Sequence, residues 1–142
     1  ADLYIFEVAA FEMRWPFLEY AAEGHRFHER IERSLERARE ITLDDYHAAL
    51  AWKDALRARY LAASDRIDGM IGLTAPEIAP VGLENLGHPF MCSPASCMGA
   101  PALTLPTLSA DGLPLGLQLV GFHHRDADLF AHASWVDNAL SG

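Results

Sequence analysis

Residues 112–121 read GLPLGLQLVG, and the apolar residues of this stretch predict a buried strand. Three of its residues weaken an ordinary strand. Pro114 lacks an amide hydrogen for the ladder, Gly116 has no side chain to pack, and Gln118 is polar. We infer that something other than strand stability selected these residues.

The residues around this stretch predict a hairpin followed by a helix. ALTLP at 102–106 precedes it, and the intervening Asp111-Gly112 pair can adopt the positive φ angles of a tight reversal. Apolar residues recur at helical spacing over 125–140, and two acidic residues in the first turn, Asp126 and Asp128, complement the positive end of a helix. The expected buried face of this last helix holds Leu129, Ala133, Val136 and Leu140.

Upstream of the hairpin, residues 65–100 contain few periodic patterns. IDGMIGL at 67–73 predicts a short buried strand, and the prolines of TAPEIAPVG predict an extended loop after it. Residues 82–100 are rich in Gly, Pro and Ser and predict a long irregular segment, a kind of segment that is usually functional or disordered. Phe90, Met91 and Met98 favour a packed segment.

Residues 1–64 are helical in pattern. The expected helices cover 3–22, the charged stretch at 25–40, and 43–63, where Thr42 with Asp44 and Asp45 resembles a capping box. The second helix has a narrow apolar stripe of Phe27, Ile31, Leu35 and Ala38, and the third an apolar face of Tyr46, Leu50, Leu56 and Tyr60 with Trp52 beside it. We therefore expect an α/β chain of the mixed α+β kind. It is one segment over 1–142, with N-terminal helices over 1–64, then a few strands of a mixed sheet, a long loop and a last helix over 65–142.

Composition restricts the classes of partner. The chain has 142 residues, 51% of them hydrophobic and 22% charged, which is typical of a globular domain. Its net charge of −9 disfavours nucleic acid and anionic membranes, and no apolar run reaches the ~20 residues that cross a bilayer. Two closely spaced cysteines do not form a secreted disulfide framework. These features predict a cytoplasmic protein.

The candidate chemical groups have plain structural interpretations. Cys92 and Cys97 form a lone C-x4-C without a second pair at zinc spacing, so packed thiols are favoured over a metal site. A cysteine nucleophile paired with His88, His123 or His124 is a minor alternative. His25 and His28 beside Glu29 and Glu32 are better explained as a solvated helix face. We expect no metal and no cofactor, and neither a phosphate-binding glycine loop nor a G-x-S-x-G element occurs.

The order of several elements resembles the C-terminal portion of the amidase signature family. These elements are RIDGMIGLTAPEIAP, the Gly99-Ala100-Pro101 triplet, DGLPLGLQLVG, and Asp126 at the start of the last helix. The preceding ITLDDYHAALAWKDALRARY resembles the family's preceding helix, so the resemblance covers nearly the whole chain. In that setting Pro114 enters a strand where its amide is not needed, Gly116 permits a close approach, and Gln118 bonds backbone groups of an irregular loop. With Gly112 these residues form the expected structural motif.

The resemblance also implies what the chain lacks. The family hydrolyses amide C–N bonds with a Lys, a cis-Ser and a nucleophilic Ser from an upstream Gly-Ser-rich signature, which is absent here. Lys53 is the only lysine and lies within an expected helix. We therefore expect no catalytic residue in this chain and no activity from it alone. The positions expected to line a substrate pocket are Ser96, Cys97, Met98 and Gly99. Two other differences from the family are Leu73-Thr74 in place of Pro-Thr and Ser96 in place of Asn.

Two hypotheses follow about the chain's role. In the first, it is the C-terminal segment of an amidase that acts on a small-molecule amide once the rest of the protein is present. In the second, it is a stand-alone oligomeric interaction or regulatory module derived from an amidase. In either case uncovered strand edges favour self-association, or pairing with a chain that supplies the missing N-terminal part.

Overall fold

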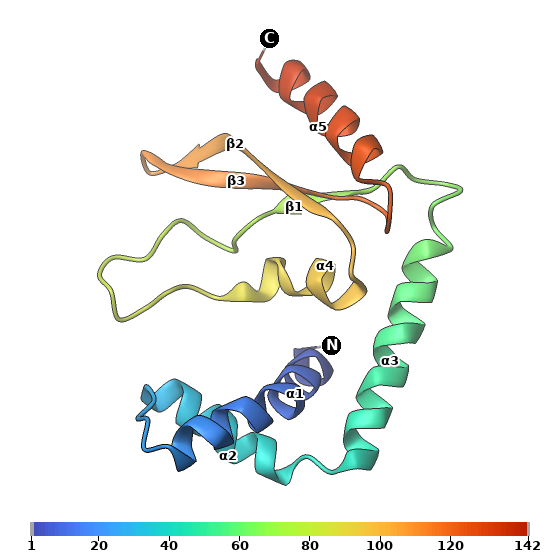
Figure 1. The fold of residues 1–142 in the computed structure, drawn as a ribbon. Coiled ribbons are helices and arrows are strands. Elements are labelled where there is room, and N and C mark those ends of the chain that lie inside the picture. The colour runs from blue at the N-terminus through green and yellow to red at the C-terminus, as the bar shows by residue number, and fades with distance from the viewer. Residues whose placement is uncertain (1, 142) are drawn as a thin grey trace. The chain divides into compact units, whose positions relative to one another are not determined.

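The computed structural model describes residues 2–141, with side chains for 6–140. Contacts divide the chain into an N-terminal unit, Ala1–Ala55, and a C-terminal unit, Leu56–Gly142, and helix α3 crosses the division. The elements in chain order are α1 (Asp2–Ala22), α2 (Glu29–Glu40), α3 (Leu43–Leu61), β1 (Met70–Leu73), the 3-10 helix η1 (Pro89–Met91), α4 (Ser93–Met98), β2 (Ala102–Ala110), β3 (Leu113–Val120) and α5 (Asp126–Ser141) (Figure 1). This order confirms the helices, the first strand and the hairpin expected from the sequence.

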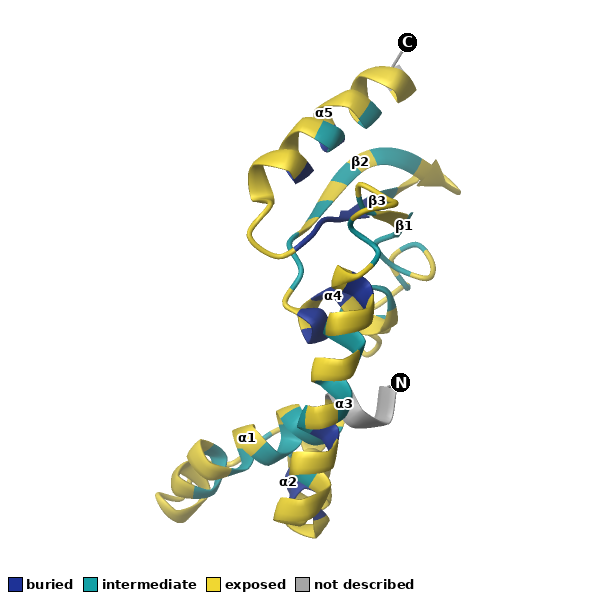
Figure 2. Ribbon diagram, turned by 90° about the vertical axis from the view of Figure 1, so that its right-hand side faces the viewer, coloured by how far each residue is buried: buried dark blue, intermediate teal, exposed yellow. Residues whose placement is uncertain are grey.

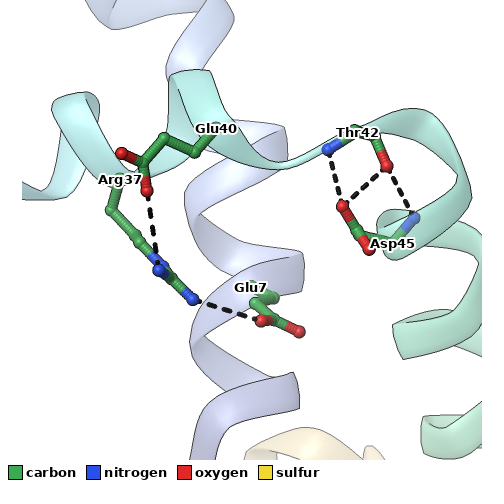
Figure 3. Close-up of polar contacts among 5 residues, drawn as sticks. All are labelled: Glu7, Arg37, Glu40, Thr42 and Asp45. Atoms are coloured by element: carbon green, nitrogen blue, oxygen red, sulfur yellow. Dashed lines mark hydrogen bonds and ion pairs between the residues drawn. The ribbon is translucent and has the colours of Figure 1, made fainter.

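The N-terminal unit is held together by aromatic and charged contacts. The Phe11 and Tyr46 rings stack with their centroids 4.2 Å apart, and the Tyr46 hydroxyl donates to Glu12 at 2.8 Å. Arg37 of α2 reaches Glu7 of α1 and Glu40 of its own helix at 3.6 Å each (Figure 3). The apolar stripe predicted for α2 is confirmed: Leu35 and Ala38 are buried, and Phe27 and Ile31 are half-buried.

The N-terminus of α3 has the reciprocal cap that the sequence predicts. The Thr42 hydroxyl accepts from the Asp45 amide at 3.1 Å, and the Asp45 carboxylate accepts from the Thr42 amide at 3.0 Å and from its hydroxyl at 2.6 Å (Figure 3). These bonds, the side-chain one first, lower the pKa of Asp45 below its ordinary value. The stabilisation is therefore present at neutral pH and is lost as pH falls through that lowered pKa.

The C-terminal unit is built around β3. The sheet has the order β1-β3-β2, and both pairings are antiparallel. Helix α5 lies over one face of the sheet and α4 lies beside the other (Figure 1). Residues alternate along β3, so that its odd-numbered leucines and its even-numbered residues face opposite ways. Leu119 packs against Leu129 and Ala133 of α5, while Val120 packs on the α4 side with Met98 and Tyr60.

The turn between β2 and β3 agrees with the sequence-based expectation. Asp111 and Gly112 have φ angles of 52° and 76°, which is the left-handed backbone that a two-residue hairpin turn requires. The pairing slips between Leu105 and Leu108, which marks an irregularity of the bulge kind in β2.

Two sequence-based expectations about this unit are wrong. The sequence predicts a buried β1, but Ile71 is 62% exposed, because β1 is an edge strand with no described strand on its outer side. The composition of residues 82–100 predicts an irregular segment, but residues 89–98 form η1 and α4, where Ala95, Cys97 and Met98 are buried (Figure 2). The expectation that this segment is packed holds for Met98, whereas Phe90 is exposed.

Tyr60 gives a first test of this core. Its buried hydroxyl donates to the carbonyls of Val120 and Gly121 at 3.0 and 3.2 Å, and burial raises its pKa. Tyr60→Phe should lower the free energy of unfolding by about 1 kcal/mol at neutral pH. A raised folded pKa means that the native chain loses this stabilisation as pH rises above about 10. Urea unfolding at several alkaline pH values should show a smaller loss in the variant, and equal losses would contradict this account.

Thr107 gives a second test. Its hydroxyl oxygen is buried and has no hydrogen-bond partner among the described residues. Thr107→Val keeps the shape and removes the unpaired hydroxyl, so it should raise the free energy of unfolding by about 1 kcal/mol. Ser109→Ala, at an exposed position of the same strand, is the matched control and should change stability by less than about 0.5 kcal/mol. A destabilised Thr107→Val chain would mean that the hydroxyl has a partner.

Candidate functional site

The missing side chain of Gly116 brings two hydroxyl groups together. Thr74 follows β1, and its amide donates to the Gly116 carbonyl at 2.8 Å, while Thr104 lies on β2 across β3. The two threonine hydroxyl oxygens are 3.1 Å apart. A Cβ atom on residue 116 would lie 2.5 Å from Thr104 Cγ2 and 2.6 Å from Thr74 Oγ1. Only glycine therefore fits between them.

A cavity of about 450 Å³ opens beside this hydroxyl pair. Its walls are the segment after β1, together with Thr104 and the start of β3, so all of them belong to the C-terminal unit. The lining residues are 74–80, 82, 85–88, 104 and 114–116. This volume lies within the range usual for small-molecule sites, and we take the cavity as the candidate functional site.

Two side-chain hydrogen bonds hold the segment that contains η1 close to the cavity. Buried Gln118 donates through Nε2 to the Met91 carbonyl at 3.0 Å, and the Cys92 thiol donates to the Thr74 carbonyl at 3.2 Å. Gln118 lies on the same face of β3 as Gly116, because the two positions are two residues apart along the strand. The even-numbered face of β3 therefore both leaves room for the hydroxyl pair and anchors the segment after the cavity loop.

The C-terminus of α4 is fixed by residues from two other elements. The Met98 carbonyl accepts from Arg57 Nε at 2.7 Å, and the Gly99 carbonyl lies 2.8 Å from His123 Nδ1. Gly99 has a φ of 62° and follows the last turn, where bonds from Gly99 to Ser96 and from Ala100 to Ala95 form a Schellman motif. A Cβ on residue 99 would collide with the Arg57 guanidinium.

The residues expected to line a pocket have different environments. Ser96 and Gly99 are exposed, whereas Cys97 is buried and Met98 belongs to the core. None of the four is among the lining residues of the cavity, which does include Pro114 and Gly116. Sequence reasoning did not identify Thr74 and Thr104 as a pair. The strict alternation of leucine with other residues over 113–119 was the signal that Gly116 and Gln118 share one face.

The other groups weighed from the sequence are engaged in local contacts. His88 accepts through Nδ1 from the Phe90 amide at 3.2 Å, and the His123 and His124 rings lie with their centroids 3.8 Å apart. Among residues 2–141 no three His, Cys, Asp or Glu side chains are grouped as a metal site would require. Within the same residues no helix is long and apolar enough to cross a membrane.

Comparison with known proteins places this geometry in a family. Two relatives, each named as one of the subunits of glutamyl-tRNA(Gln) amidotransferase, come from Exiguobacterium sibiricum and from a Wolbachia of Brugia malayi. They are 32% and 33% identical to this chain over 104 residues each, which is 64% and 68% of the chain. A solved structure described as that of an amidase is 28% identical, with a TM-score of 0.79 over 95% of this chain. No family model matches the sequence.

The chain belongs to the amidase signature family and corresponds to a C-terminal portion of its members. It spans 22% and 21% of the lengths of the two relatives and 35% of the solved amidase. The likeness to that structure extends over both units, and the helices and the small sheet are a portion of the amidase signature fold.

Gly116 provides the test of the local geometry. Gly116→Ala should lower the free energy of unfolding by about 1–3 kcal/mol, because the new methyl group overlaps Thr74 and Thr104. Gly72→Ala in β1 is the matched control, since a Cβ there meets nothing within 4 Å, and it should leave stability nearly unchanged. Urea unfolding of both variants measures the difference. Equal effects would show that the close approach at Gly116 is unimportant.

Proposed function

We propose that this chain is the C-terminal segment of an amidase signature hydrolase, and that the full-length protein cleaves amide C–N bonds of small molecules. One observation carries the proposal. The chain superimposes over 95% of its length on a solved amidase, yet spans only 35% of that protein. The segment then acts as one part of a larger amidase domain and contributes its cavity to the substrate pocket.

The catalytic chemistry belongs to the upstream part of the full-length protein. There a lysine activates the cis-Ser, which takes the proton of the nucleophilic serine as that serine attacks the amide carbonyl. Backbone amides stabilise the oxyanion that forms. The acyl-enzyme is then resolved by water or another acceptor.

The chain by itself is inactive in this proposal. A serine nucleophile needs a base within hydrogen-bond reach. The serine hydroxyls with a described hydrogen bond each donate to a carbonyl four residues earlier, which supports a structural role: they are Ser34, Ser93 and Ser134. This chain's contribution is to shape and orient. In the full-length protein the turn at 96–99 forms an adjoining part of the pocket wall.

Exposed apolar side chains support association with further protein. In the C-terminal unit, Ile71 on the edge strand is 62% exposed and Trp135 on α5 is 72% exposed (Figure 2). Such groups and an open strand edge are usually covered. We propose that the rest of the polypeptide covers them in a cytoplasmic enzyme. If the segment exists alone, self-association covers them instead, and the chain is then an oligomeric interaction or regulatory module.

The native length of the polypeptide separates these two functions. We expect an antibody against this segment to detect, in the source cells, a species several times larger than 15.7 kDa. That species, once purified, should release ammonia from hexanamide, whereas the 142-residue chain should release none. A native species near 15.7 kDa, or a long species that hydrolyses no aliphatic or aryl amide, would overturn the proposal.

A further inference from the structure

We propose that the cavity beside Gly116 binds the neutral, apolar part of an amide substrate and rejects amides that carry a carboxylate. This inference rests on the proposed function and adds the substrate class to it. It is carried by the residues that line the cavity, their charges, and the hydroxyl pair at its base.

Most of the cavity wall is apolar. The segment after β1 contributes alanines and prolines together with Ile78 and Leu86, and the start of β3 contributes Pro114 and Leu115. A hydrocarbon or aryl group entering such a space leaves water without breaking hydrogen bonds. The expected gain is about 25 cal/mol for each Å² of apolar surface that is buried.

The charged and titratable lining groups do not favour an anion. Glu77 is the only carboxylate among the described lining residues, and no arginine or lysine is among them. His88 is the remaining titratable side chain. Its Nδ1 accepts a hydrogen bond from the Phe90 amide, so its proton lies on Nε2 and the ring is neutral.

A carboxylate placed here would lose water without gaining a cation. Burying an unpaired carboxylate is among the most costly events in a binding site. Glu77 adds repulsion, and the net charge of −9 gives the whole chain an unfavourable field for anions. The described part of the cavity thus discriminates by charge before any detail of shape is considered.

The hydroxyl pair supplies the one polar contact that a neutral amide or ketone needs. Thr74 and Thr104 share a single hydrogen bond, which uses one of their two hydroxyl hydrogens. The second hydrogen is free to donate, and oxygen lone pairs remain to accept. A ligand carbonyl beside Gly116 therefore meets a donor, and a ligand N–H meets an acceptor.

The test compares two ligands that differ only at one end. Methyl pentyl ketone is a neutral compound that amidases cannot hydrolyse, and its analogue carries a carboxylate in place of the terminal methyl group. Isothermal titration calorimetry is performed on the polypeptide at its native length. We expect the ketone to bind at least about tenfold more tightly than the carboxylate, since the carboxylate must be buried unpaired.

Two pairs of variants assign the discrimination to named residues. Glu77→Gln should raise the affinity of the carboxylate analogue about threefold, while Glu84→Gln, exposed in the same segment but outside the cavity, should not change it. Thr104→Val keeps the side-chain shape and should lower the ketone affinity about fivefold, because one hydrogen bond is lost. Thr107→Val on the same strand is its matched control and should have no effect on binding.

The results separate this inference from the proposed function. Equal or tighter binding of the carboxylate analogue, failure of the ketone to bind, or an unchanged ketone affinity in Thr104→Val would each overturn the inference. Hydrolysis of amides by the same polypeptide would then still support the proposed function. Preferential ketone binding by a polypeptide of 15.7 kDa that hydrolyses no amide would overturn the function and leave the cavity's selectivity standing.

Discussion

Strand β3 pairs with both other strands of the C-terminal unit, so its register sets the position of everything that packs on the sheet. Its leucines face α5, and Gly116 and Gln118 face the opposite way. A shift of one residue would exchange these faces, because side chains alternate along a strand. The buried glutamine amide would then lie against the apolar surface of α5. The polar requirement of Gln118 and the space requirement of Gly116 therefore both select the observed register.

The segment from η1 to Gly99 depends on contacts from outside itself. Helices of three and six residues are too short to be stable alone. Their carbonyl groups are held at one end by Gln118 and at the other by Arg57 and His123. Three side chains from distant parts of the sequence thus position a turn that would otherwise have many conformations. This is why the wall beside the cavity has a defined backbone although it contains little regular structure.

Local sequence patterns predicted the features that depend on neighbouring residues. The Thr42 cap, the Asp111-Gly112 turn and the stripe on α2 each follow from residues a few positions apart. Helix α4 was missed because its stability comes from donors on other elements. The burial of β1 was wrong because an edge position is a property of the sheet and not of the four residues. The meeting of Thr74 and Thr104, which are 30 residues apart, could not be predicted before the strand order was known.

The arrangement at the end of α4 makes two positions dependent on each other in evolution. Gly99 leaves the space that the Arg57 guanidinium occupies, and Arg57 in turn holds the carbonyl that precedes Gly99. A larger residue at 99 requires both a left-handed backbone and the displacement of the arginine, so either change alone is unfavourable. Homologous sequences should therefore change these two positions together. Such covariation would be a record of the contact that can be read without any structure.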